Sequence, residues 1–259
     1  MTAPEVLKPS SREEAAALFE AGVTLIGGGT IVIPELTSGR LRPERAMLLT
    51  DAGLGGITRD ARRITIGATT PVSELESLPA PIGPCAANVA DTEIRAQGTV
   101  GGNLCAGAGL DAPRGDLQGA LLAVGATVRS TGAGGETTEP LEDFLPQHND
   151  RLLLDVSFEE PAAGAFAALI RPHTHDYTAL AVSAARGRDG TIRLAATGVA
   201  GHAVRLPSAE AKANDPDAAA AAAAADVAFA DDALASAWYR NRTLPVLVRR
   251  ALTQLEEGR

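Results

Sequence analysis

Several residue types are scarce in this chain of 259 residues, and each scarcity argues against a class of protein. Only two cysteines occur, Cys85 and Cys105, and neither has a C-x-x-C partner or a histidine at metal-ligand spacing. We therefore expect no iron–sulfur or zinc site on this chain, and no metal ligands among its four histidines. Five Phe, two Tyr and one Trp leave few aromatic surfaces on which a substrate would stack.

Positive charge and long apolar runs are also in short supply. The chain has 23 Lys and Arg residues against 32 Asp and Glu, and its formal net charge is −9. The basic residues are scattered, so we expect no nucleic-acid partner. No run is long enough to span a bilayer and residues 1–5 lack a signal-peptide pattern, which predicts a cytoplasmic protein without membrane insertion. A hydrophobic content of 45% suffices for at least two subdomains.

What the sequence does contain is two glycine-rich loops, Gly27-Gly28-Gly29-Thr30 and residues 99–103 (T-V-G-G-N). Each follows an apolar or β-branched stretch and precedes a predicted helix. Glycine lets a backbone approach a ligand closely and turn its N–H groups toward one anion, so the pair predicts a phosphate clamp for a dinucleotide. The first loop lacks the last glycine of a Rossmann fingerprint, and neither loop carries the lysine of a Walker motif.

Periodicity and capping residues predict mixed secondary structure. Ser11 and Glu14 form a capping box that starts a helix, which ends near Gly22. The predicted strands are residues 23–26, 47–50, 64–67, 126–130, 152–156, 166–170 and 192–199. The other predicted helices are residues 84–94, 116–124, 177–185, 231–238 and 244–255. Strands and helices do not alternate strictly, which favours an α+β fold. The alanine-rich residues 218–225 predict an exposed or loosely packed surface helix.

The ordered motifs resemble those of the FAD-binding medium subunit of molybdenum hydroxylases, the group containing xanthine dehydrogenase and aerobic carbon monoxide dehydrogenase. Residues 26–34 (I-G-G-G-T-I-V-I-P) are similar to the family's A-G-G-T-D-L-x-P segment, and residues 94–104 (I-R-A-Q-G-T-V-G-G-N-L) are close to its I-R-N-x-G-T-I-G-G-N-L. Shorter similarities follow in the same order at residues 66–70, 115–122, 171–177 and 235–252.

This resemblance implies a two-lobed FAD-binding domain of the vanillyl-alcohol-oxidase type over residues 1–158, with lobes of about 1–55 and 56–158. A smaller C-terminal α+β domain over residues 163–259 follows. The FAD would lie between the lobes, with its pyrophosphate on backbone N–H groups of both loops. The implied cofactor-binding residues are Ile26, Gly27, Gly28, Gly29, Thr30, Ile31, Thr99, Gly102, Asn103 and Asp116. We expect no catalytic and no metal-ligating residue.

Asp116 matches an acidic residue that in the family lies by the ribose or ribityl hydroxyls. Two alternatives stay open: Asp116 caps a helix that begins at Leu117, or Asp111 takes the hydroxyl role, because the stretch from Asn103 to Asp116 is longer than in the family. The chain also departs from the pattern at Ile31, where a polar residue is frequent, and at Ala167, where some relatives have a basic residue near the flavin.

The resemblance implies an oxidoreductase subunit that passes electrons from the iron–sulfur clusters of a partner through FAD to an external acceptor. The implied partners are a small iron–sulfur subunit and a large molybdopterin subunit, in a dimer of heterotrimers. Two alternatives are a flavin-free structural subunit of such a complex and a free-standing FAD oxidoreductase. The substrate of the complex and the final acceptor, whether NAD, oxygen or a quinone, stay open.

Overall fold

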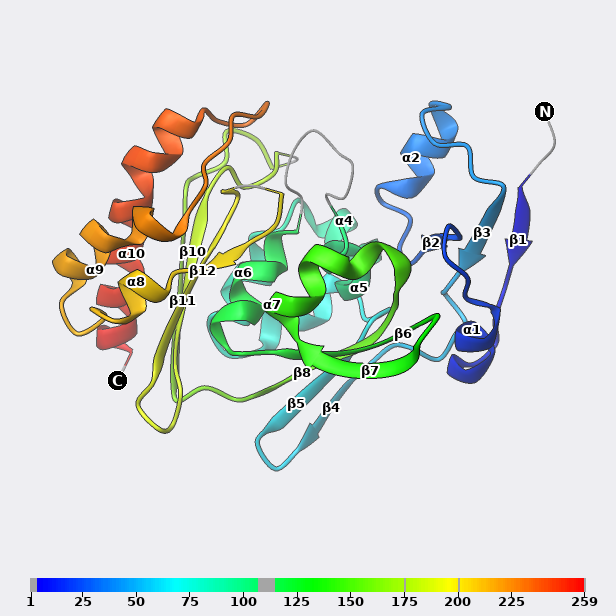
Figure 1. Cartoon of the computed structure of the whole chain (residues 1–259), viewed down its shortest axis with the longest axis horizontal. Coiled ribbons are helices and arrows are strands. Elements are labelled where there is room, and N and C mark those ends of the chain that lie inside the picture. The colour runs from blue at the N-terminus through cyan, green and yellow to red at the C-terminus, as the bar shows by residue number, and fades with distance from the viewer. Residues whose placement is uncertain (1–3, 107–114, 175, 200, 259) are drawn as a thin grey trace.

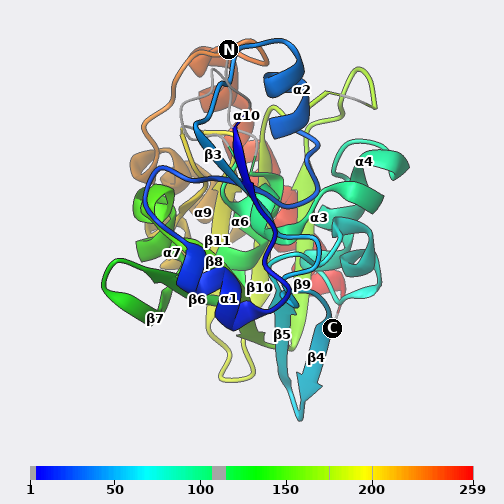
Figure 2. The ribbon, with the colours of Figure 1, turned by 90° about the vertical axis from the view of Figure 1, so that its right-hand side faces the viewer.

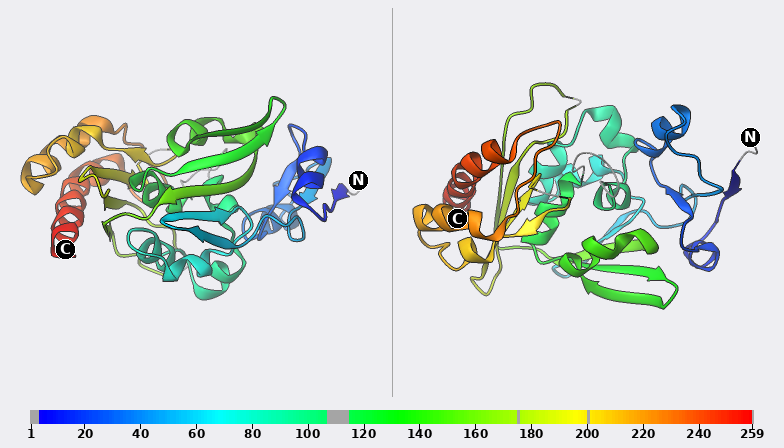
Figure 3. Two further views of the ribbon diagram at one scale, coloured as in Figure 1. Left: turned by 90° about the horizontal axis from the view of Figure 1, so that it is seen from below. Right: turned by 45° about the horizontal axis from the view of Figure 1, so that its top comes forward.

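The computed structural model describes residues 4–106, 115–174, 176–199 and 201–258, and these form three parts in a row (Figure 1). A small N-terminal lobe lies at one end, a central lobe holds the largest sheet, and a C-terminal domain ends in a long helix. The N-terminal strand and this last helix lie at opposite ends of the molecule (Figure 3). Mixed helices and strands of this kind confirm the α+β class.

The small lobe is built on a three-stranded parallel sheet in the order β1-β3-β2 and faces the viewer in Figure 2. Its elements are β1 (Glu5–Leu7), α1 (Arg12–Leu18), β2 (Thr24–Ile26), α2 (Val32–Thr37) and β3 (Arg45–Leu48). The predicted cap of α1 is confirmed, because the Ser11 hydroxyl accepts a hydrogen bond from the Glu14 backbone N–H at 3.1 Å. The Glu14 carboxylate reaches back one residue further than a capping box requires, to Ser10.

The central lobe contains a five-stranded antiparallel sheet in the order β4-β5-β8-β6-β7. Its strands are β4 (Ile57–Asp60), β5 (Arg63–Gly67), β6 (Thr127–Gly132), β7 (Gly135–Pro140) and β8 (Leu152–Glu159). Its helices are η1 (Val72–Ser77), α3 (Ile82–Ala87), α4 (Thr92–Gln97), α5 (Val100–Leu104), α6 (Asp116–Ala123), α7 (Leu141–Phe144) and η2 (Leu145–Asp150), where η marks a 3₁₀ helix. Every residue of α6 is buried, which makes it the central helix of the molecule.

The C-terminal domain has a four-stranded antiparallel sheet in the order β12-β11-β10-β9. Its elements are β9 (Ala163–Ala168), β10 (Ala181–Arg186), β11 (Ile192–Thr197), β12 (Val204–Arg205), α8 (Pro207–Glu210), α9 (Pro216–Ala222), η3 (Ala223–Asp226) and α10 (Ala237–Glu257). One face of this sheet packs on α6 and the other on α10, so both faces are buried. Within the described ranges, no helix combines the length and apolarity needed to cross a bilayer.

Two predicted helices of the second half are wrong. Residues 177–185 contain most of β10, a strand without polar alternation because both its faces are covered, so its alanine-rich sequence reads as helical. Residues 231–238 are mostly loop, since the Asp232 side chain accepts hydrogen bonds from the Leu234 and Ala235 N–H groups in place of a helical turn. Helix α10 begins only after its cap, Ser236.

Two further predictions need correction. Residues 84–94 form two short helices, α3 and α4, because Ala90 takes a positive φ of 39° and Asp91 caps α4 afresh. The alanine-rich segment is not an exposed or loosely packed surface helix, since Ala219, Ala220 and Ala223 are buried in the core of the C-terminal domain. The predicted domain limits stay a prediction; the three sheets span residues 5–48, 57–159 and 163–205.

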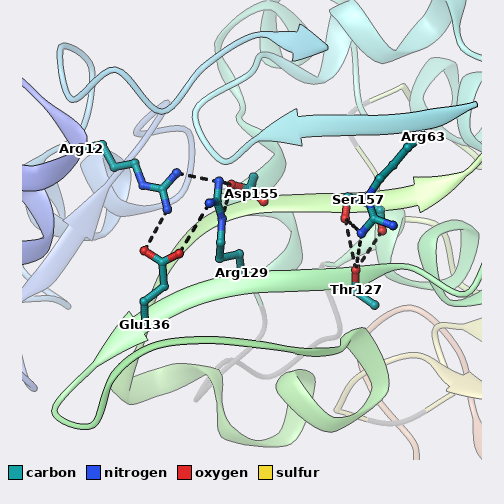
Figure 4. Close-up of polar contacts among 7 residues, drawn as sticks. All are labelled: Arg12, Arg63, Thr127, Arg129, Glu136, Asp155 and Ser157. Atoms are coloured by element: carbon teal, nitrogen blue, oxygen red, sulfur yellow. Dashed lines mark hydrogen bonds and ion pairs between the residues drawn. The ribbon is translucent and has the colours of Figure 1, made fainter. Parts of the chain in front are cut away.

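Ion pairs tie the small lobe to the central sheet (Figure 4). Arg12 of α1 contacts Glu136 of β7 at 2.9 Å and Asp155 of β8 at 3.9 Å. Arg129 of β6 lies between them and binds both carboxylates. Because α1 belongs to the lobe that carries the first glycine loop, this network helps to set the position of that loop against the central lobe.

Candidate functional site

The two glycine-rich loops, at residues 27–30 and 99–103, lie far apart in the sequence and touch each other in the fold. A Cβ added to Gly28 would lie 1.7 Å from the Gln97 carbonyl oxygen, and one added to Gly27 would lie 2.5 Å from the Thr99 hydroxyl oxygen. Only glycine allows this approach. At Gly29, a φ of 73° adds a second requirement for glycine, because the chain turns there into α2.

Beside the touching loops lies a cleft of about 1050 Å³, at the upper end of the range for ligand sites. All of the predicted site residues except Ile26 line it; Ile26 is buried beneath the loop. Apolar side chains from all three parts complete the walls, among them Val23, Leu25, Leu49, Val89, Leu152 and Tyr177. The cleft therefore offers an apolar space next to backbone amides.

The first loop presents unused donors. Among the described residues, no hydrogen bond uses the backbone N–H groups of Gly28, Gly29 or Thr30. The loop continues into α2, where Gly29 accepts from the Ile33 N–H at 3.0 Å and Ile31 from the Glu35 N–H at 3.3 Å. A loop with unpaired amides is suited to bind an anion.

The second loop differs, because its amides are already bonded inside the protein. The N–H of Gly101 donates to the Ala68 carbonyl at 2.7 Å, that of Gly102 to the Thr99 hydroxyl at 3.1 Å, and that of Asn103 to the Thr99 carbonyl at 2.8 Å. Thr99 caps α5 through the bond to Gly102. The N–H groups of Gly101, Gly102 and Asn103 are therefore already paired, and the second loop lines the cleft with these residues and Thr99.

Asp116 lies deep in the cleft at the start of α6. Burial raises the pKa of this carboxyl to about 7, although hydrogen bonds from Thr178 and the charge of Arg171 act to lower it. Asp116 does not cap its helix: the cap position is Gly115, and the Asn103 carboxamide oxygen accepts from the Leu117 N–H at 2.9 Å. The structure therefore favours a ligand or inter-domain role over capping. Asp111 lies outside the described residues.

The two cysteines have no reactive character. Burial raises the pKa of Cys105, at the edge of the cleft, to about 12, and it also raises the pKa of the Cys85 thiol. The Cys85 thiol donates a hydrogen bond to the Asp116 backbone carbonyl at 3.3 Å. No group of His, Cys, Asp and Glu side chains able to hold a metal occurs in the part of the chain that the structure describes.

Sequence reasoning missed residues that the fold brings to the same place. Asn88 and Thr178 come from different domains, yet the Asn88 amide donates to the Thr178 hydroxyl oxygen at 2.9 Å. Ala90 lines the cleft in its positive-φ turn. No local motif marks these positions, since each depends on how the C-terminal domain packs on α3 and α6.

Comparison with known proteins gives a family and a set of structures. Residues 2–158, more than half of the chain, match the family described as the FAD binding domain in molybdopterin dehydrogenase. Among curated protein sequences the chain has no match.

Solved structures match over nearly the whole chain. A chain of carbon monoxide dehydrogenase from Hydrogenophaga pseudoflava, which lacks the Mo-pyranopterin moiety of the molybdenum cofactor, is 26% identical with a TM-score of 0.86, over 99% of this chain and 98% of that chain. Reconstituted CO dehydrogenase from Oligotropha carboxidovorans has a chain with 25% identity and a TM-score of 0.87, over 100% and 99% of the two chains. Quinoline 2-oxidoreductase from Pseudomonas putida 86 has a similar fold, with a TM-score of 0.83 at 20% identity over 99% and 98%.

Proposed function

Since this chain belongs to the family of FAD-binding domains in molybdopterin dehydrogenases, and is thus an FAD-binding oxidoreductase subunit, we propose that it transfers electrons within a molybdenum-containing hydroxylase complex. Electrons would enter from iron–sulfur clusters on a small partner chain, whose source is a molybdopterin centre on a large partner chain. They would leave to an external acceptor. The arrangement expected for such a complex is a dimer of heterotrimers.

The observation that carries this proposal is the cleft between the glycine-rich loops. The amides of Gly28, Gly29 and Thr30, which have no partner among the residues that the structure describes, suit a pyrophosphate without help from a lysine. Asp116 offers carboxylate oxygens for ribose or ribityl hydroxyls, and the apolar walls suit a ring system. These amides, this carboxyl and the apolar walls therefore fit FAD, which argues against a flavin-free structural subunit.

In this proposal the residues of the chain bind and orient the cofactor and keep water from it, and none acts as an acid or base. Bound FAD supplies a centre that takes up two electrons and can release them singly, which suits a link between one-electron clusters and a two-electron acceptor. Thr30 adds a side-chain hydroxyl at the end of the first loop, and Ile31 contributes apolar contact where relatives often have a polar residue.

The first test is a calorimetric FAD titration of the purified chain with FMN as the comparator, together with an absorbance spectrum. We expect tight binding of FAD over FMN with shifted flavin bands, because the amides of the first loop bind a pyrophosphate that FMN lacks. A folded chain that takes up no FAD, also when its partner chains are present, contradicts the proposal.

The second test concerns the partners. Native protein isolated from its source cell should co-purify with one smaller cysteine-rich chain and one much larger chain. A lone monodisperse monomer would instead favour a free-standing FAD oxidoreductase. The two tests are independent, since the first examines the cleft and the second examines the surface of the folded chain.

A further inference from the structure

We propose that the exposed face of α10 is the docking surface for a partner protein chain whose own surface carries carboxylates around an apolar recess. The residues of this surface, called the α10 patch below, are Ile170, Trp238, Tyr239, Arg242 and Val246. The inference rests on the proposed function, because it takes this chain to be a subunit of a complex. The patch lies outside the family match, which ends at residue 158.

Exposed apolar side chains gather at this place. Among the described residues, the large apolar side chains that are exposed are Val6, Ile33, Ile170, Trp238, Tyr239 and Val246. The first two belong to the small lobe, and the other four all belong to the α10 patch. Ile170 is 97% exposed, and Trp238, the only tryptophan of the chain, is 68% exposed. A cluster of such side chains in water is typical of an interaction surface, because burying it releases hydrophobic free energy.

The helix α10 has one buried face and one exposed face. Its buried face packs in the core of the C-terminal domain and consists of Leu244, Leu247, Val248, Ala251, Leu252 and Leu255. Trp238, Arg242 and Val246 follow one another at intervals of four residues, so they form a single row on the side turned away from that core. Figure 1 shows α10 at the end of the molecule that lies opposite the small lobe.

Two hydrogen bonds place Ile170 at the same end of the domain as the first turn of α10. The Leu169 N–H, next to Ile170, donates to the Leu180 carbonyl at 3.0 Å. The Arg240 guanidinium, in the first turn of α10, donates to the Ala179 carbonyl at 3.1 Å. Because Ala179 and Leu180 are adjacent, the loop that carries Ile170 and the start of α10 are fixed to the same short segment before β10.

The base of the patch is held firmly. Arg240 is 1% exposed, and it forms an ion pair with Asp232 at 2.7 Å. Within the patch, the Arg242 guanidinium carbon lies 5.9 Å from the centroid of the Trp238 ring, which is a cation–π contact. A surface that is ordered before binding loses less conformational entropy when a partner docks, so more of its contact energy appears as affinity.

The charge of α10 indicates the chemistry of the partner. The helix has no acidic residue from Ala237 to Leu255, although the chain as a whole has a net charge of −9. Arg242 and Arg250 are exposed, and among the described residues no ion pair involves either of them. Carboxylates on the partner would complement these cations. The combination of Trp, Tyr and Arg is also the one enriched at the centres of protein interfaces.

The same features argue against two other occupants. A second copy of this chain, docked symmetrically on the same surface, would place Arg242 of one copy near Arg242 of the other. A lipid surface requires a helix with a free apolar face, and the apolar face of α10 is already buried in the core of the domain. A different protein chain with an acidic surface therefore fits the patch best, and the experiment distinguishes all three occupants.

The experiment uses the full chain and four variants. Trp238→Ala removes the largest apolar side chain of the patch, and Arg242→Glu reverses its charge. The matched controls are Val6→Ala, at an exposed apolar residue of the small lobe, and Arg59→Glu, at an exposed arginine of β4. None of these four residues lines the cleft, so FAD affinity should stay within about twofold of the wild type in each variant. Far-UV circular dichroism and thermal unfolding check that the variants are folded.

The first readout is local to the patch. Because Trp238 is the only tryptophan, a chain labelled with 5-fluorotryptophan has a single ¹⁹F resonance. The probe is the pair of unlabelled partner chains that co-purify with the native protein, separated from it and added back. We expect this resonance to shift or broaden when they bind, since Trp238 moves from water into the partner's recess.

The second readout is affinity for the same partner chains, measured by calorimetry. The dissociation constant should rise at least about tenfold in Trp238→Ala and in Arg242→Glu. Val6→Ala and Arg59→Glu should stay within about twofold of the wild type. Added salt should weaken binding of the wild type more than binding of Arg242→Glu, because the wild type uses a charge pair that salt screens.

Partner chains that bind without moving the ¹⁹F resonance, or with unchanged affinity in both Trp238→Ala and Arg242→Glu, overturn the inference and leave the proposed function intact. A native chain that is isolated alone overturns both. Two further results overturn the acidic partner: sedimentation that shows a dimer of the wild type abolished by Trp238→Ala, and binding to vesicles of phosphatidylcholine and phosphatidylglycerol that the same variant abolishes.

Discussion

The two glycine-rich loops look alike in the sequence and differ in what their backbones do. In the first loop, the N–H groups of Gly28, Gly29 and Thr30 take part in no hydrogen bond among the described residues. In the second, Gly101, Gly102 and Asn103 each donate to a partner within the central lobe. The first loop is therefore equipped to bind an anion, and the second to hold the first in place.

The surroundings of the loops explain this difference. The first loop leaves a three-stranded sheet at the edge of the small lobe, where few neighbours compete for its amides. The second begins α5, whose residues Val100 and Leu104 are fully buried, and Thr99 caps that helix. In the first loop, glycine allows the close contact of Gly28 with the Gln97 carbonyl oxygen, and in the second it allows Gly101 to pack against the Ala68 carbonyl oxygen.

The largest effect is expected at Gly28, where the two loops touch. A methyl group there would lie 1.7 Å from the Gln97 carbonyl oxygen, so Gly28→Ala must push the loops apart. We expect a loss of about 3 kcal/mol or more in the free energy of unfolding, measured with urea, and loss of FAD binding. The control is Gly102→Ala at an exposed position of α5, where the added Cβ lies 3.0 Å from the Thr99 hydroxyl and the cost should stay below about 1 kcal/mol. Equal losses of unfolding free energy in Gly28→Ala and Gly102→Ala would contradict the difference between the two loops.

The next largest effect is a dependence of the unfolding free energy on pH, and it comes from Asp116 in the cleft. The folded-state pKa of Asp116, about 7, lies above its ordinary value of 3.8, so the folded chain holds a proton that the unfolded chain releases. The contribution of Asp116 is therefore present at low pH and is lost as the pH rises through 7. Between pH 5 and 8 the FAD-free wild type should lose on the order of 2 kcal/mol more than Asp116→Asn. Parallel curves from urea unfolding would show that Asp116 has an ordinary pKa.

Removing the Asp116 side chain tests the binding side of the same residue. Asp116→Ala should weaken FAD binding at least about tenfold, or about 1.4 kcal/mol, because the hydroxyls of FAD lose a carboxylate acceptor. The amides of the first loop remain, so binding is weakened rather than abolished. Calorimetry on a variant shown to be folded decides this, and an unchanged dissociation constant refutes the hydroxyl role.

A substitution at Asn103 tests whether the second loop stabilises the fold or contacts FAD directly. Its carboxamide oxygen accepts from the Leu117 N–H, one of the donors at the start of α6. Asn103→Ala should cost about 1 kcal/mol of unfolding free energy and change FAD affinity less than Asp116→Ala does. Asn103→Asp keeps an acceptor oxygen and should recover most of the stability. A larger loss in affinity than in stability would move Asn103 into direct contact with the cofactor.

The smallest effect is expected where the lobes are joined by ion pairs. Arg12→Ala removes the contact to Glu136, and both side chains are partly exposed, so the loss of stability should stay within about 1 kcal/mol. FAD affinity should fall slightly, because the small lobe that carries the first loop is held less firmly. Urea unfolding and calorimetry at low and high salt measure this, and the salt dependence should be weaker in the variant.

Much of the small lobe could be predicted from local sequence. The Ser11 cap, the strand before the first loop and the glycines of both loops follow from residue chemistry within a few positions. The family was also recognisable, since the match to residues 2–158 includes both loops. The helix predicted at residues 177–185 failed because β10 is buried on both faces, and its sequence alone does not reveal the second layer.

The two glycine-rich loops, the acidic residue at position 116 and the α+β class follow from the amino-acid sequence alone, because backbone freedom, charge and apolar periodicity are properties of short segments. The packing of distant segments determined the rest: among the described residues, the amides of Gly28, Gly29 and Thr30 stay unpaired, and Asn88 bonds to Thr178 across the domain boundary. The reason is physical: whether an amide is free, or a carboxyl is buried beside a hydroxyl, depends on which distant segments pack against it.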